Sequence, residues 1–263
     1  MIFAAGLGTR LKPLTDTMPK ALVRVGGQPL LWHVIMKLKA AGYERLVVNV
    51  HHFAQQIVDY LAENRNFGLD IRISDESDQL LETGGGIKKA LPLFDPAEPI
   101  LIHNVDILSN LDLTALPTDA PLLVVSQRNT KRYLMFDDDM RLRGWTNIET
   151  GELKGPIARS APPLGSSKNC ALGQRPLATK GTQELSIVNS QLKKLAFSGV
   201  HMFHPSLAPL LSEWPDRFPI MDFYLKACAD HLIRGYEATN LRLLDVGKLD
   251  TLQEAENFLD IIH

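Results

Sequence analysis

Cysteine, basic clusters and long apolar runs are scarce or absent in this 263-residue sequence. Its two cysteines, Cys170 and Cys228, belong to no CxxC pair, so they indicate neither a metal-binding ribbon nor a disulfide scaffold. The formal net charge is −2 and no basic block occurs, so nothing points to nucleic acid or an anionic membrane surface as a partner. No apolar stretch reaches the length of a membrane span, and the first residues lack the features of a signal peptide. We therefore expect a cytoplasmic protein.

Common catalytic motifs are also missing. The eight histidines show no HExxH or comparable metal spacing, and no GxSxG or Cys–His pattern indicates a covalent nucleophile. The dinucleotide-binding fingerprint fails because Leu11 stands where its third glycine belongs. The Walker loop fails because Gly8 is followed by Thr9 and Arg10. A phosphate site in this chain must use another pattern.

What is present is an alternation of strand-like and helix-like segments. Short apolar runs typical of strands cover residues 1–5, 46–50, 69–73, 100–102 and 122–125. Apolar residues at helical spacing cover 30–38, 53–61 and 84–91. This alternation predicts an α/β fold with a Rossmann-like, mainly parallel sheet and helices on both faces. Ligands bind such sheets beyond the carboxyl ends of the strands. If the strand at 1–5 is central in the sheet, it is short for that position, and we would then expect a residue or two to precede it.

The pattern changes after about residue 130. Segments 133–136 and 142–145, joined by an acidic turn, predict a β-hairpin. Segment 196–203 predicts a strand, and 219–232 and 249–262 predict helices. Residues 159–190 are rich in Pro, Gly, Ser, Thr, Asn and Gln, and we expect an inserted surface loop there.

The strongest local signal is the stretch AAGLGTR, which directly follows the first strand. Gly6 and Gly8 allow backbone N–H groups to approach phosphate oxygens without a Cβ in the way. Arg10 can fork onto terminal phosphates, and Lys20, behind two prolines that stiffen the loop, can place a compact positive charge nearby. The stretch predicts a phosphate-binding loop.

The full pattern, GxGTRxxPxTxxxPK, resembles the signature of the sugar-nucleotide pyrophosphorylases, the family of sugar-1-phosphate nucleotidyltransferases. Apart from 159–190, the resemblance spans nearly the whole chain. It implies a glycosyltransferase-A-like fold in one domain over 1–263, with a nucleotide-binding half at about 1–130 and a small β-rich, sugar-binding half at about 131–263. It also implies Mg²⁺-dependent transfer from a nucleoside triphosphate to a sugar 1-phosphate. No hexapeptide repeats follow the last predicted helix, so we expect a single activity.

A second glycine-rich stretch, LETGGG at 81–86, opens a predicted helix. Family members hold the base and ribose with a similar loop, whereas three glycines also serve any tight connection. This form is most similar to the branch of N-acetylmuramate 1-phosphate uridylyltransferases and bacterial mannose-1-phosphate guanylyltransferases. The resemblance places the nucleotide on Ala5, Gly6, Gly8, Thr9, Asp78, Gln79, Thr83, Gly84 and Asn104.

Two aspartates complete the expected catalytic set. Asp106 ends the run HNVD, with Val105 where the family usually has glycine, and Asp245 stands in LDVG. A lone aspartate at a strand end is often a cap or turn residue. The resemblance implies that both carboxylates hold Mg²⁺, a cation that prefers one or two carboxylates together with phosphate oxygens and water. It also implies that Arg10, Lys20 and Asp106 are catalytic.

The expected sugar pocket involves the second half of the chain. Ser198 and Gly199 resemble the family's FSGI segment, which lines the sugar pocket, and Gly144 lies on the predicted hairpin. Trp145 beside it is either a ligand contact or part of the core.

Two other functions fit the same sequence. One is a cytidylyltransferase for phosphocholine or a similar phosphate, which would need an aromatic and acidic cage. The other is a catalytically inactive nucleotide or sugar-phosphate sensor. The base, the sugar and the oligomeric state cannot be derived from the sequence.

Overall fold

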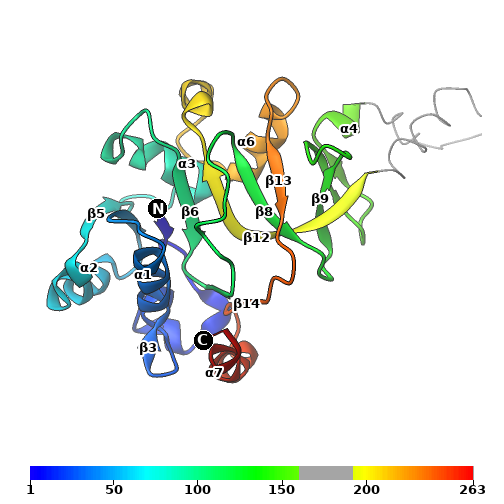
Figure 1. Ribbon diagram of the computed structural model, residues 1–263. Helices are drawn as coiled ribbons and strands as arrows, with labels where there is room; N and C mark the ends of the chain where they lie inside the picture. Colours follow the sequence, from blue (N-terminus) through cyan, green and yellow to red (C-terminus); the bar gives the residue numbers. More distant parts are fainter. Residues whose placement is uncertain (160–191, 263) are drawn as a thin grey trace, which may run out of the picture.

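The computed structural model describes residues 1–159 and 192–262, so the expected loop at 159–190 lies almost entirely outside the described residues (Figure 1). A ten-stranded sheet has the order β11-β10-β9-β12-β6-β1-β4-β5, and β8 and β13 join it through β12. Its strands are β1 (Ile2–Phe3), β4 (Arg45–Val50), β5 (Asp70–Asp75), β6 (Ile100–Asn104), β8 (Leu122–Ser126), β9 (Arg132–Phe136), β10 (Leu142–Asn147), β11 (Leu153–Lys154), β12 (Lys193–Phe203) and β13 (Arg234–Glu237).

Strand directions confirm the mainly parallel central sheet. Strands β5, β4, β1 and β6 are parallel neighbours, and β13 is parallel to β8. Strand β12 is antiparallel to both β6 and β8, so it alone runs against the others in this part of the sheet. The apolar run Leu46–Val50 is explained by its place in this sheet, because β4 is covered on both faces.

Helices cover both faces of the sheet, as the alternation predicts (Figure 1). Strand residues point alternately to opposite faces, so Val47 and Val48 enter different cores. Helices α1 (Leu30–Ala40), α2 (Ala54–Glu63) and α7 (Asp250–Ile262) pack with Val48 in one core. Helices α3 (Glu82–Ala90) and α6 (Ile220–Ala227) pack with Val47 in the other. Within the described ranges, no helix is long and apolar enough to cross a membrane.

The predicted hairpin is also confirmed. Strands β9 and β10 are antiparallel, β11 pairs with β10, and the first residues of β12 pair with β9. The short helix α4 (Pro156–Arg159) follows β11. This antiparallel extension is the small β-rich part of the molecule.

Several features of the structure differ from the sequence prediction. The helix expected at 219–232 ends at Ala227, and the chain then returns to the sheet as β13. Strand β13 was missed because its sequence, RGYE, lacks an apolar pattern. A separate two-stranded sheet of β7 (Ile107–Ser109) and β14 (Leu243–Asp245) was missed as well, since each strand has only three residues.

Candidate active site

A cleft of about 550 Å³ opens where β1 and β6 end, as expected for a parallel sheet. We call it the first cleft. It brings together residues that lie far apart in the sequence. The predicted site residues that line it are Ala5, Gly6, Gly8, Thr9, Arg10, Lys20, Thr83, Asn104 and Asp106.

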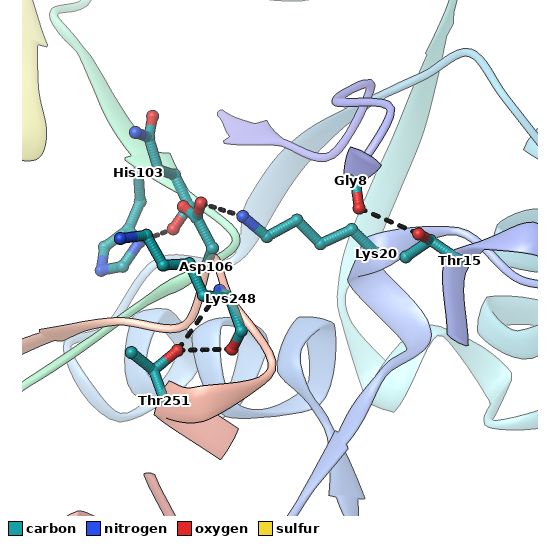
Figure 2. A network of polar contacts seen from close by, with 8 residues as sticks. Gly8, Thr15, Lys20, His103, Asp106, Lys248 and Thr251 are labelled. Atoms are coloured by element: carbon teal, nitrogen blue, oxygen red, sulfur yellow. Dashed lines mark hydrogen bonds and ion pairs between the residues drawn. The ribbon is translucent and has the colours of Figure 1, made fainter. Parts of the chain in front are cut away.

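The loop after β1 is held in place by hydrogen bonds from two directions. The backbone N–H of Ala4 donates to Oδ1 of Asn49 at 2.7 Å. Figure 2 shows the second bond, in which Oγ1 of Thr15 donates to the carbonyl oxygen of Gly8 at 2.9 Å. Gly8 has φ +61°, and a Cβ there would lie 2.9 Å from Cγ2 of Thr15 and 3.0 Å from Cβ of Lys20. Position 8 therefore requires glycine, because any other residue would be strained at this φ and its Cβ would clash with Thr15 and Lys20.

Lys20 is the buried cation of the first cleft. It begins the short 3-10 helix Lys20–Leu22, and the residue is only 8% exposed. Its ammonium group forms an ion pair with the carboxylate of Asp106 (Figure 2). The pair places a positive and a negative charge at the same end of the cleft, beside the open backbone of the glycine loop.

Asp245 is not a lining residue of the first cleft, but strand pairing places it beside Asp106. Strand β14 places Asp245 opposite Ile107 on β7, and the N–H of Val246 donates to the carbonyl oxygen of Asp106 at 2.8 Å. A Cβ on Gly247 would lie 2.7 Å from both Nη2 of Arg10 and Oδ1 of Asp245. The arginine, the two aspartates and Lys20 thus come from four separate segments and meet in one place.

The electrostatics of Asp245 reflect this arrangement. Desolvation by partial burial raises the pKa of its carboxyl group, and the negative charge of Asp106 raises it further. The positive charges of Lys20 and Arg10 oppose this effect on the pKa. Two carboxylates that repel each other beside cations fit a divalent cation that takes its other ligands from substrate and water. Among the described residues, no group of three or more His, Cys, Asp or Glu side chains that could hold a metal ion occurs.

The glycine run of α3 packs against the loop before α6 rather than against a ligand site. A Cβ on Gly84 would lie 2.2 Å from the ring of Phe218, and a Cβ on Gly85 would lie 1.9 Å from the carbonyl oxygen of Asp216. The N–H of Gly84 donates to the carbonyl oxygen of Phe218 at 2.8 Å. Gly84 therefore does not line the cleft, whereas Thr83 does, and its Oγ1 accepts from the N–H of Ile220 at 2.9 Å. The helix requires glycines here because the loop before α6 approaches closely.

The sequence analysis missed a buried carboxylate in the cleft. Glu76 is fully buried, accepts from Nδ2 of Asn49 at 2.7 Å and lines the cleft. Burial raises the pKa of Glu76. By contrast, Asp78 and Gln79 are exposed and do not line the cleft. The available signal was Asn49, an amide within the apolar strand run RLVVNV, since such a side chain requires a buried polar partner.

A second cleft of about 450 Å³ adjoins the first and shares Phe3, Thr83, Asn104 and Pro219 with it. Trp145 lines this cleft, whereas Gly144 does not, because successive strand residues face opposite sides. A Cβ on Gly144 would lie 2.4 Å from Ile157, so this glycine serves packing behind the cleft. Polar and aromatic lining residues that the sequence analysis did not assign to the site are Arg128, Thr130, Arg132, Lys154, Phe197, His201 and Asp222.

Ser198 and Gly199 lie behind the wall of the two clefts. Ser198 is buried, and neither residue lines the first or the second cleft. Gly199 has φ +74°, and a Cβ there would lie 3.1 Å from Nδ2 of Asn104. These residues allow β12 to approach the end of β6 and so support the position of Asn104.

Comparison with known proteins decides the family of the first half of the chain. Residues 1–121 match the nucleotidyl transferase family. This segment is a nucleotidyl transferase domain. An N-acetylmuramate alpha-1-phosphate uridylyltransferase of Neisseria meningitidis serogroup B is 46% identical over 116 residues, which cover 44% of this chain and 49% of the relative. One of Caulobacter vibrioides is 50% identical over 108 residues, which cover 40% of this chain and 44% of the relative.

The fold of the whole chain has a match as well. A UDP-glucose pyrophosphorylase in complex with UDP-glucose superimposes with a TM-score of 0.70 at 16% identity, covering 100% of this chain and 98% of the other. The sequence match spans about half of the length of the two uridylyltransferases. The nucleotidyl transferase domain thus contains the loop, Lys20 and Asp106, whereas Asp245 and most of the second cleft lie beyond it.

Proposed function

We propose that this chain transfers a nucleoside monophosphate from a nucleoside triphosphate to a sugar 1-phosphate and releases pyrophosphate. The observation that carries the proposal is the convergence of Arg10, Lys20, Asp106 and Asp245 beside the glycine loop. A reaction between two polyanions needs both substrates positioned and their charge neutralised, and these side chains suit that task. The similarity of the first half to two uridylyltransferases supports the same reaction class.

In the proposed reaction, an oxygen of the sugar phosphate bonds to the α-phosphorus as the bond to the pyrophosphate oxygen breaks. The nucleophile is already an anion, so no general base is required. The open backbone around Gly6 and Gly8 would bind the triphosphate together with Arg10, and Lys20 would neutralise charge near the reacting phosphorus. Asp106 and Asp245 would hold Mg²⁺, which when bound supplies positive charge to the phosphate oxygens.

Two substrate pairs are proposed: UTP with N-acetylmuramate 1-phosphate, or GTP with mannose 1-phosphate. The names of the relatives from Neisseria and Caulobacter favour the first pair. Phosphocholine is disfavoured because Arg128, Arg132 and Lys154 in the second cleft would repel a quaternary ammonium group. A sensor without activity would not need the full set of cations and carboxylates around Asp106.

Pyrophosphate release by the purified protein tests the proposal. UTP, GTP, CTP, ATP and dTTP would each be combined with N-acetylmuramate, mannose, glucose and N-acetylglucosamine 1-phosphates and with phosphocholine, with Mg²⁺ or with a chelator. We expect one strongly preferred pair whose turnover stops with the chelator. A folded protein that binds a nucleotide yet releases no pyrophosphate with any pair would contradict the proposal and favour the sensor.

A further inference from the structure

The second cleft is built mainly by the antiparallel extension and by α6. It shares Phe3, Thr83 and Asn104 with the first cleft, so a molecule bound there would lie next to a molecule in the first cleft. Its volume, about 450 Å³, suits a sugar with one or more substituents. We call the part of the cleft formed by β9, β10 and β11 its outer wall. An acceptor would contact the side chains of this wall with the part of the sugar that is remote from its phosphate.

Strand register places two cations on one face of this outer wall. Trp145 on β10 stands opposite Leu134 on β9 and opposite Lys154 on β11. Arg132 precedes Leu134 by two positions, so it points to the same face as Leu134 and Trp145. All four residues line the cleft. The cations thus stand on the two strands that flank the strand of Trp145.

The lining carries an excess of positive charge. Its charged side chains are Arg128, Arg132, Lys154 and one acid, Asp222. Lys154 lies 3.4 Å from Asp222, and its ammonium group stands 5.4 Å from the ring centre of Trp145. Within residues 1–159 and 192–262, Arg132 forms no ion pair, although the residue lines the second cleft. An unpaired arginine in a concave wall suits an anion.

The phosphate group of the acceptor would be neutralised by cations of the first cleft rather than by those of the outer wall. It must lie next to the α-phosphorus, at the end of the first cleft where Arg10 and Lys20 stand. Arg128 also acts there, because its charge lowers the pKa of Asp245. Strands β9 and β11 contribute to the second cleft and not to the first. Arg132 and Lys154 therefore face a different part of the acceptor.

We propose that Arg132 and Lys154 bind a carboxylate that the sugar carries in addition to its phosphate. The inference rests on the proposed function and narrows it, since mannose 1-phosphate has no such group and N-acetylmuramate 1-phosphate has one. Arg132 forks onto the carboxylate, Lys154 adds a second charge, and the ring of Trp145 lies between them against the sugar.

Matched acceptors test this proposal. N-acetylmuramate 1-phosphate differs from N-acetylglucosamine 1-phosphate only by its lactyl ether, and glucuronate 1-phosphate differs from glucose 1-phosphate only by its carboxylate. For each acceptor, kcat/KM would be measured with the preferred nucleotide, and Kd by calorimetry, in the wild type, Arg132→Gln and Lys131→Gln. Lys131 is the matched control, since it is the next residue, pairs with Glu149 at 2.9 Å and does not line the cleft.

We expect the wild type to prefer the carboxylated member of at least one pair by about 10- to 100-fold, the range of a hydrogen bond to a charged group. Arg132→Gln should bring this ratio towards one, whereas Lys131→Gln should keep it. Equal use of both members, or a preference that Arg132→Gln retains, would overturn the inference and leave the proposed function intact. If no acceptor is turned over, the Kd ratio decides: a carboxylate preference lost in Arg132→Gln supports the inference even though the proposed function fails, and its absence overturns both.

Discussion

The ammonium group of Lys20 forms an ion pair with the carboxylate of Asp106, a residue 86 positions further along the chain. Both side chains are largely withdrawn from solvent, with exposed fractions of 10% and 19%. At such a place, removing one charge leaves the other poorly solvated. The pair therefore links the stability of the fold to the chemistry proposed for the first cleft.

Asp106→Asn should lower kcat by at least about 100-fold, because it removes a carboxylate proposed to hold Mg²⁺ and leaves the charge of Lys20 without its partner. Pyrophosphate release would be followed while the Mg²⁺ concentration is varied. Near-wild-type turnover at limiting Mg²⁺ would refute the role of this carboxylate. The variant should also unfold at lower urea concentration than the wild type, and the double variant Lys20→Met/Asp106→Asn should recover part of that stability without recovering activity.

Lys20→Ala should cost about 2–4 kcal/mol of transition-state stabilisation, comparable to the loss of one preorganised electrostatic donor. The loss should appear in kcat, because the charge is placed near the reacting phosphorus. Steady-state kinetics in both substrates checks this. If only KM rises while kcat is unchanged, the lysine binds ground state and transition state equally, contrary to the proposal.

Two glycine substitutions should separate packing from function. Gly85→Ala places a Cβ 1.9 Å from the carbonyl oxygen of Asp216 and should destabilise the fold by about 1–3 kcal/mol or more. Gly6→Ala meets no atom within 4 Å, so stability should change little, yet the new methyl group stands in the proposed triphosphate site and should raise the KM for the nucleotide. Thermal unfolding and nucleotide kinetics would be measured for both. An unstable Gly6→Ala with normal nucleotide affinity would contradict this division.

Acid should destabilise the protein through its buried histidines. Burial lowers the pKa of His201 to about 3 and that of His103 to about 4, from a usual value of 6.5. Below pH 6.5 these histidines bind protons in the unfolded chain but stay neutral in the folded chain. The free energy of unfolding is therefore at its full value above pH 6.5 and decreases as the pH falls towards 3. His201→Phe should reduce the slope of unfolding free energy against pH, between pH 6 and 4, by up to about 1.4 kcal/mol per unit.

Urea unfolding at several pH values measures that slope. Phenylalanine suits the site because the rings of Phe3, Phe197 and Tyr224 surround His201. The exposed His231, changed to Gln, serves as the control and should keep the wild-type slope. Equal slopes in His201→Phe and the wild type would show that this imidazole takes up no extra proton on unfolding.

The part of the first cleft formed by the loop after β1 could be anticipated from local sequence, and the reason is physical. The glycines of the loop after β1, Arg10 and Lys20 all lie within residues 6–20, so their pattern is visible in the sequence. The glycine run at 84–86 shows the limit of this reasoning. Its glycines matched a ligand-binding pattern, but the close neighbours that require them, Phe218 and Asp216, lie more than a hundred residues away.

The sequence by itself determined the alternation of strands and helices, the glycine-rich loop after β1 and the hairpin, because each depends on neighbours within a few positions. Only the tertiary structure decided which side chains meet. The pairing of β7 with β14 brings Asp245 to Asp106, and the register of β9, β10 and β11 turns Trp145, rather than Gly144, towards the second cleft. Strand pairing over long separations depends on the packing of the whole chain, and short strands with weak apolar patterns leave little trace of it in the sequence.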